Sequence, residues 1–300
     1  MATLSPIFSP DATSFLAGLA VYQLLNRVLH KLARRLDPAF YATLELDKSR
    51  KLAPYFVFPV GLLVTLVTAP ICLSAYNETP PATDVFAAQR PFTTSGKICL
   101  ASRGVLWISE LPLLSYSPEY FAHHVLALAS LLVTLVQSAP RRPFYLIYAG
   151  LATEIFSDTI ALLRHHGRNA GNSSVFRRAM VANVVTMVVL RIVPIAAFAA
   201  TMPRPSPDFI AGVTMYCVYL ARLTYIQLRT LGFIGDGVDQ TAGAGLSGKE
   251  PAKPTSAMSL FQRPITLVVC VAAVITSMSV NEYFKSFAEH PAMLSSRIST

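Results

Sequence analysis

The chain has 300 residues, of which 53% are hydrophobic and only 14% are charged, and its formal net charge is +9. Soluble domains carry about 25% charged residues, so this composition excludes an ordinary soluble protein and indicates a polytopic membrane protein. The positive charge does not indicate a nucleic-acid-binding protein, because the basic residues flank apolar segments and form no basic helix interleaved with aromatic side chains.

Apolar windows of about 20 residues, the length of an α-helix that crosses a bilayer, recur along the chain. They cover residues 12–30, 52–76, 98–117, 120–139, 144–164, 178–201, 208–230 and 264–283. The first window is followed by Asn26 and Arg27 and lacks a small-residue cleavage site, so we interpret it as a retained span and not as a signal peptide. The sequence therefore predicts an all-α transmembrane helix bundle of seven to eight spans.

The composition between these windows predicts how the chain is organised. We expect an N-terminal span and basic loop over residues 1–44 and a main transmembrane domain over residues 45–232. A flexible linker rich in Gly, Ser, Thr and Pro follows over residues 233–263, and a C-terminal span and tail over residues 264–300.

Loop charge predicts the orientation in the membrane. The loops on one side carry about twice as many Lys and Arg residues as those on the other, and the richer side is expected to face the cytosol. It includes the basic segments within residues 31–51, 164–178 and 229–263. Both termini then lie outside the cytosol. The glycosylation triplet that begins at Asn77 lies there as well, although Pro80 directly after it disfavours its use.

Several motifs of soluble enzymes are missing from the sequence. There is no GxSxG elbow, P-loop, GxGxxG or HExxH, which disfavours serine hydrolysis, nucleotide hydrolysis, dinucleotide redox chemistry and zincin proteolysis. The four cysteines, Cys72, Cys99, Cys217 and Cys270, have no CxxC spacing. We therefore expect neither a disulfide framework, nor a metal site, nor a bound cofactor.

Ionisable residues inside the apolar windows are the main indication of function. His123 and His124 open the fourth window, and Glu154 and Asp158 lie within the fifth. An ionisable group in lipid is costly unless it is paired or solvated, so such residues usually mark a functional site. At 1.5 Å of depth per residue, further polar residues share the cytosolic half of the bilayer, with Arg191 nearer its middle. These are Glu110, Asn183 and Arg222.

Helical spacing places these residues on particular faces. His123, Ala127, Ser130, Thr134 and Gln137 share one face of the fourth window, and Gly150, Glu154, Ser157, Asp158 and Ala161 share one face of the fifth. We expect both polar faces to line one space. His124 points about 100° away from the His123 face, which leaves both a packing role and a functional role open for it.

A histidine beside a carboxylate can accept a proton from an amine or a hydroxyl group. We therefore expect His123 to be a general base with Asp158 or Glu154 as its partner, and Arg222 to bind an anionic part of a donor. Three alternatives stay open. The acids could form structural ion pairs with Arg191 and Arg222, the polar faces could bind lipid without catalysis, or the histidines and acids could form the proton relay of a transporter. Arg103, near a helix end, is expected to snorkel towards the interface.

Three segments resemble the TLC domain of ceramide synthases and other lipid-related membrane proteins. They read YFAHHVLALAS from Tyr120, LATEIFSD from Leu151 and RAMVANVVTMVVLRI from Arg178, and the likeness covers roughly residues 45–232. The last segment is similar to the branch of the family outside the ceramide synthases. The family's His-Asp-x-x-Asp run is absent, and Phe56 stands where many relatives have a histidine.

The resemblance implies a multi-pass protein of the endoplasmic reticulum that acts on lipids. It implies acyl transfer from acyl-CoA, as a co-substrate, to a lipid such as a sphingoid base, or else a non-catalytic role in lipid homeostasis or trafficking. The residues that it makes catalytic are His123, His124, Glu154 and Asp158. For substrate binding we expect Glu110, Ser130, Asn183, Arg191 and Arg222. Association into a homo-oligomer stays open.

Overall fold

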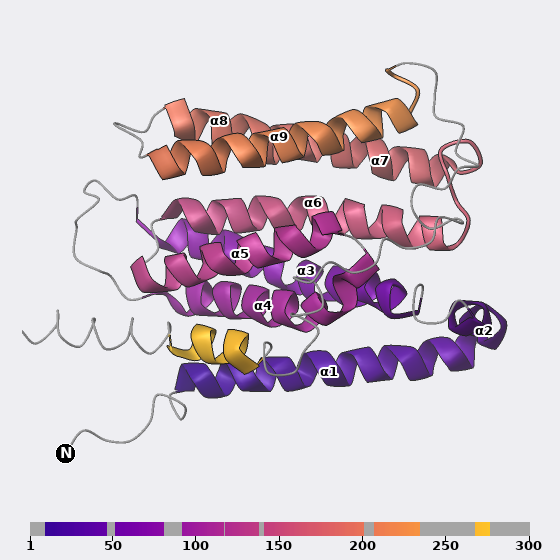
Figure 1. The fold of residues 1–300 in the computed structure, drawn as a ribbon, viewed down its shortest axis with the longest axis horizontal. Helices are drawn as coiled ribbons and strands as arrows, with labels where there is room; N and C mark the ends of the chain where they lie inside the picture. The colour runs from indigo at the N-terminus through magenta and orange to yellow at the C-terminus, as the bar shows by residue number, and fades with distance from the viewer. Residues whose placement is uncertain are drawn as a thin grey trace, which may run out of the picture. The chain divides into compact units, whose positions relative to one another are not determined.

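The computed structural model describes residues 10–46, 52–80, 92–116, 118–137, 141–200, 207–234 and 268–276. Within these ranges every regular element is a helix and there is no strand (Figure 1), which confirms the predicted all-α class. The predicted linker lies outside the described residues except for residues 233 and 234, and so does the last predicted span except for a short helical stretch at 268–276.

The observed helices follow the predicted windows closely. The first five windows correspond to α1 (Pro10–Leu36), α3 (Leu52–Glu78), α4 (Thr94–Glu110), α5 (Pro118–Gln137) and α6 (Arg141–His165). The sixth window is a continuous run of α7 (Ser174–Thr186), the π-helical η3 (Met187–Ile192) and α8 (Val193–Ala200), and the seventh is α9 (Pro207–Thr230). A 3₁₀ turn, η2 (Leu111–Tyr116), follows α4.

The short helix α2 (Pro38–Leu46) was not predicted, because it is too brief to show as a hydrophobic window. Its start nevertheless has a local cause. Asp37 accepts a hydrogen bond from the backbone N–H of Phe40 at 2.9 Å, and Pro38 occupies the first helical position, where its missing N–H costs nothing.

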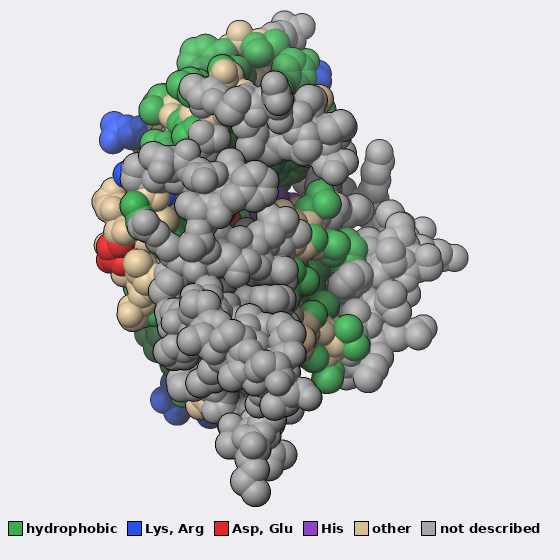
Figure 2. Space-filling model, turned by 90° about the vertical axis from the view of Figure 1, so that its left-hand side faces the viewer, with side chains coloured by type: hydrophobic (Ala, Val, Ile, Leu, Met, Phe, Trp, Pro, Cys, Tyr) green, Lys and Arg blue, Asp and Glu red, His purple; other side chains and the backbone are tan. Residues whose placement is uncertain are grey.

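Three helical segments in the described chain are long and apolar enough to cross a membrane. They are Tyr55–Glu78, Pro143–His165 and Ser174–Ala200. Exposed valines recur every four residues along the last of these, at Val181, Val185, Val189 and Val193, and Figure 2 shows hydrophobic side chains over much of the coloured surface. An apolar stripe of this kind is expected against lipid and not against water. These features are compatible with an integral membrane protein, and the count of seven to eight spans stays a prediction.

The chain divides into two compact units. One comprises residues 1–145 and 251–300, and the other comprises residues 146–250. In the first unit α4 packs against α1, α3 and α5 and is buried along much of its length. Glycines allow this close packing. A Cβ atom on Gly104 would lie 3.0 Å from the Phe15 ring and 3.1 Å from Leu131, and one on Gly18 would lie 3.0 Å from Val105.

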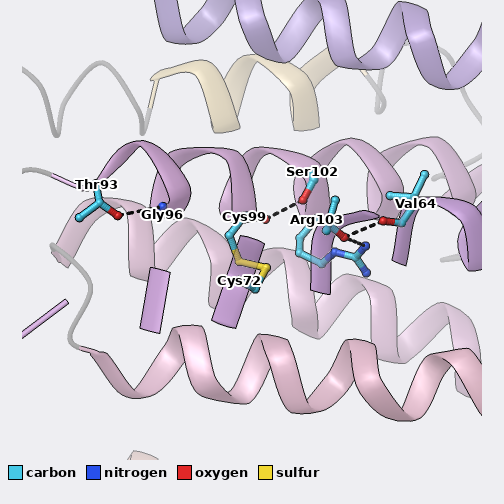
Figure 3. The surroundings of a disulfide bond; sticks show 8 residues. Val64, Cys72, Thr93, Gly96, Cys99, Ser102 and Arg103 are labelled. Carbon is cyan, nitrogen blue, oxygen red and sulfur yellow. Dashed lines mark hydrogen bonds between the residues drawn. A yellow bond between two sulfur atoms is a disulfide. The ribbon is translucent and has the colours of Figure 1, made fainter. Parts of the chain in front are cut away.

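A disulfide joins Cys72 of α3 to Cys99 of α4 (Figure 3), with a Cα–Cα distance of 5.0 Å. The expectation that the chain has no disulfide was therefore wrong. Spacing motifs could not reveal this bond, because the two cysteines lie 27 residues apart on separate helices and meet only once those helices pack together. The other two cysteines, Cys217 and Cys270, are free thiols.

In the second unit, two hydrophobic clusters hold the helices together. One consists of Ile160, Phe176 and Met180, with Leu231 packed against it. The other is formed by Met187, Ile195 and Leu220. Together they join α6, α7, α8 and α9, so this unit has an apolar core of its own.

Candidate functional site

The central feature of the first unit is a buried acid–imidazole pair. Nε2 of His124 on α5 lies 2.7 Å from Oε2 of Glu110 on α4. The two residues are only 6% and 4% exposed. A hydrogen bond of this length that involves an ionisable group is among the stronger ones in proteins. Removing one partner would leave the other polar group buried, at a cost of about 3–5 kcal/mol if that group keeps its charge.

Chain geometry explains why these two residues meet. Glu110 ends α4, η2 forms the turn, and α5 begins at Pro118, so the acid and the imidazole lie at equal distances in sequence on either side of Ser117. Residues placed symmetrically about a tight connection face each other across antiparallel helices. This symmetry brings the end of α4 close to the start of α5, and the rotation of α5 against α4 decides which histidine meets Glu110.

His124, and not His123, provides the inward-facing imidazole. His123 is half-buried, and its ring centroid lies 5.7 Å from that of His124 with the planes nearly perpendicular. The side chain of Ser130, which was expected on the same polar face as His123, is exposed. Thr134 and Gln137 lie outside the described side chains. The imidazole that meets the acid is therefore that of His124, for which a packing role and a functional role were both left open, and the role of His123 as general base stays a prediction.

A third polar residue approaches the pair from α1. Tyr22 is 3% exposed and interacts electrostatically with Glu110. Nothing in the sequence singles out Tyr22, because a single tyrosine in an apolar helix is usually a packing residue. Three helices, α1, α4 and α5, thus contribute polar side chains to one region of this unit.

A buried arginine lies on α4 about 10 Å from Glu110 along the helix axis. Arg103 is 1% exposed, and its Nη2 donates to Oγ1 of Thr68 on α3 at 3.2 Å. The same hydroxyl group donates to the carbonyl of Val64 at 2.8 Å (Figure 3). The expectation that Arg103 snorkels to the interface was wrong, since its side chain points into the bundle. Helix α4 therefore carries both a cation and an acid in the interior.

In the second unit, Arg191 is satisfied by neutral acceptors. It is 7% exposed and lies in η3. Its guanidinium donates to the carbonyl of Gly150 at 2.7 Å, to that of Ala149 at 3.4 Å and to the hydroxyl of Tyr216 at 3.4 Å. One of the alternatives from the sequence was an ion pair between Arg191 and an acidic side chain. In the structure the guanidinium instead contacts two carbonyl groups and a hydroxyl group. Isolated π-helical turns often occur at functional sites, and here the turn places a cation against α6.

The predicted polar face of α6 contacts α7. Asn183 is 1% exposed, and its amide donates to Oγ of Ser157 at 3.1 Å. Glu154 and Asp158, which share this face, are half-buried, whereas Arg222 on α9 is exposed. The helical spacing thus correctly placed Ser157 on the side of α6 that is turned towards other polar groups.

The predicted site residues are distributed over both units. His123, His124, Glu110 and Ser130 belong to the first unit, and Glu154, Asp158, Asn183, Arg191 and Arg222 belong to the second. The single space that was expected to join the two sets stays a prediction. Tyr22, Thr68 and the inward direction of Arg103 are the features that sequence reasoning missed.

Comparison with protein-family models, with curated proteins and with solved structures found no match for this chain. The resemblance to the TLC domain therefore stays a prediction.

Proposed function

We propose that this protein is an integral membrane protein that acts on lipids by acid–base chemistry, with His124 as the general base and Glu110 as its partner. The observation that supports the proposal is the 2.7 Å contact between two ionisable side chains that are almost completely buried. Ionisable groups held inside a helix bundle are expensive, and they are concentrated where a protein binds ligands or moves protons.

The contact also suggests how the proton would move. Nε2 of His124 lies against the acid, and the imidazole would take a proton from a hydroxyl or amine of the substrate. Glu110 would orient the ring and stabilise the imidazolium that forms. His123, half-buried and adjacent, is proposed to contact the substrate.

Acyl transfer is the reaction that the TLC resemblance favours. In that reaction a lipid amine attacks the thioester carbonyl of acyl-CoA, a C–N bond forms, and the C–S bond breaks. The proton lost from the amine passes through His124 to the departing thiolate. Ser130, in the same unit as the pair, is proposed to contact a substrate, and the endoplasmic reticulum is proposed as the membrane. The binding roles expected for Glu154, Asp158, Asn183, Arg191 and Arg222 concern the second unit and stay predictions.

Replacement of His124 tests the proposal directly. The purified full chain would be reconstituted in lipid nanodiscs with a long-chain acyl-CoA and a sphingoid base, and amide formation would be followed by mass spectrometry. We expect His124→Gln to reduce turnover at least about 100-fold, the usual contribution of a general base. His166→Gln, an exposed position in the loop after α6, is the matched control and should keep normal turnover.

Full turnover by folded His124→Gln would disprove the assignment. Glu110→Gln distinguishes the role of the acid, because it can keep a hydrogen bond but cannot stabilise an imidazolium. We expect this variant to insert into the membrane and to lose most of its activity.

A non-catalytic lipid-binding protein is the second candidate. The low exposure of both members of the pair is also what is expected of polar groups that hold a bound lipid headgroup without converting it. Saturable binding of a copurifying lipid by a protein that gives no product with acyl donors would select this candidate.

A further inference from the structure

The connection between α6 and α7 is strongly basic. In the sequence from Thr159 to Ala182 there is no Asp, Glu or Lys. All of the fixed positive charge in this stretch comes from arginines with exposed side chains. They are Arg164, Arg168, Arg177 and Arg178, and two histidines, His165 and His166, lie among them. We call residues 164–178 the basic hairpin.

The end of α9 adds to the same region. Leu231, just after α9, packs against the cluster formed by Ile160, Phe176 and Met180 at the base of the basic hairpin. The exposed Arg229 therefore lies at the same end of the second unit. The next acidic residues along the chain, Asp236 and Asp239, lie outside the described part.

Hydrogen bonds fix the backbone of the basic hairpin. Gly167 has a φ of 71° and ends α6, where the N–H of Arg168 donates to the carbonyl of Leu163 at 2.9 Å. Asn169 and Asn172 each accept a hydrogen bond from the backbone of the other, at 3.0 and 2.8 Å.

The start of α7 and one of the arginines are also held in place. Ser173 caps α7 by accepting from the N–H of Phe176 at 3.2 Å. The guanidinium carbon of Arg164 lies 5.6 Å from the centre of the Phe176 ring. The basic hairpin thus presents its arginines from a preformed frame, which lowers the entropy lost on binding.

The position of the basic hairpin determines what it can meet. It joins Pro143–His165 to Ser174–Ala200, two segments that are each long and apolar enough to cross a membrane. A short connection between two such helices lies at the level of the lipid headgroups. Arginine offers a planar set of donors that matches phosphate geometry, and clusters of four or more basic residues beside membrane helices attract anionic lipids.

We propose that the basic hairpin is a binding surface for anionic phospholipid headgroups of the leaflet that it borders. The surface is separate from His124 and Glu110, so it concerns which lipids surround the protein and not which lipid it converts. Binding would be electrostatic in large part and would weaken as salt screens the charges.

Native mass spectrometry of the full chain, in detergent supplied with either phosphatidylserine or phosphatidylcholine, tests this proposal. We expect tighter retention of phosphatidylserine by the unaltered protein. A variant with Arg164→Gln, Arg168→Gln, Arg177→Gln and Arg178→Gln should weaken phosphatidylserine binding at least about fivefold and leave phosphatidylcholine binding unchanged. The double variant Arg177→Gln/Arg178→Gln should give a smaller loss in the same direction, and it replaces the quadruple variant should that one fail to fold.

The matched control removes the same charge from α1, with Arg27→Gln, Lys31→Gln, Arg34→Gln and Arg35→Gln at exposed positions. It should retain most of the phosphatidylserine binding. An equal loss in both variants would overturn the proposal in favour of a general effect of net charge, and equal retention of the two lipids by the unaltered protein would also overturn it. Because the assay reads binding and not turnover, its result is independent of the proposed acid–base chemistry.

Discussion

Two buried arginines donate hydrogen bonds to neutral acceptors in the described structure. Arg103 donates to the hydroxyl of Thr68, and Arg191 donates to the carbonyls of Ala149 and Gly150. The guanidinium group of arginine can reach several acceptors at once from one rigid plane, whereas the ammonium group of lysine is a compact charge that is harder to desolvate. Arginine should therefore be difficult to replace at both positions.

We expect Arg191→Lys to lower the stability of the protein, because one ammonium group cannot reach both carbonyls and Tyr216. The loss of hydrogen bonds from a buried charge should cost about 1–3 kcal/mol. Thermal unfolding in detergent, followed by thiol-reactive fluorescence, would show a lower Tm. Arg222→Lys, at an exposed position on α9, should leave the Tm unchanged, and equal Tm values for the two variants would contradict this account.

At the residue scale, the sequence identified the types of residue that matter but not all of their directions. His123, His124 and Glu110 were all recognised from charge inside apolar windows. Adjacent residues on a helix point about 100° apart, so either histidine could have faced inward. The choice depends on how α5 is rotated against α4, which is a property of packing and not of local sequence.

At the scale of helices, α4 depends on its glycines. Phe15 of α1 and Leu131 of α5 occupy the space that a side chain at Gly104 would need. We expect Gly104→Leu to push these helices apart and to destabilise the first unit by about 1–3 kcal/mol or more, as overpacking usually does. Purified protein yield and Tm would report the loss.

Ala20→Leu is the control for this prediction, since it adds side-chain volume at an exposed position on α1. A Tm for Gly104→Leu as high as that of Ala20→Leu would contradict this prediction, because it would show that the helices around Gly104 can separate without a loss of stability.

Helix positions were largely predictable, because a run of about 20 apolar residues is a strong signal for a membrane helix. The π-helical turn η3 was not. The N–H of Val193 donates to the carbonyl of Val188, five residues earlier, while the apolar sequence continues through the turn without interruption. Arg191 is the one unusual residue there, and its hydrogen bonds to α6 depend on tertiary contacts that no local pattern contains.

At the scale of the whole molecule, two independent features support the same orientation in the membrane. Disulfides persist in oxidising compartments, so we predict that Cys72 and Cys99 lie away from the cytosol. Arg141, the first residue of α6, donates to the carbonyl of Tyr76, one turn from Cys72. If α6 crosses the bilayer, its other end and the basic hairpin lie on the cytosolic side, as the positive-inside rule predicts.

Cysteine labelling would test this orientation. In a background with Cys217→Ser and Cys270→Ser, single substitutions would be made at two exposed positions, Asn77→Cys and Arg177→Cys. In sealed vesicles with the cytosolic face outward, we expect a membrane-impermeant maleimide to label position 177 at once and position 77 only after detergent is added. The reverse pattern, or labelling of both positions before detergent, would contradict the predicted topology.

The covalent bond between α3 and α4 also affects how the intactness of the chain can be judged. A protease that cuts anywhere between Cys72 and Cys99 leaves two polypeptides that remain attached through their sulfur atoms. On a gel without reductant such nicked molecules would migrate close to full-length protein, and their fragments would separate only after dithiothreitol is added. Paired reduced and non-reduced gels are therefore the appropriate check on any preparation of this protein.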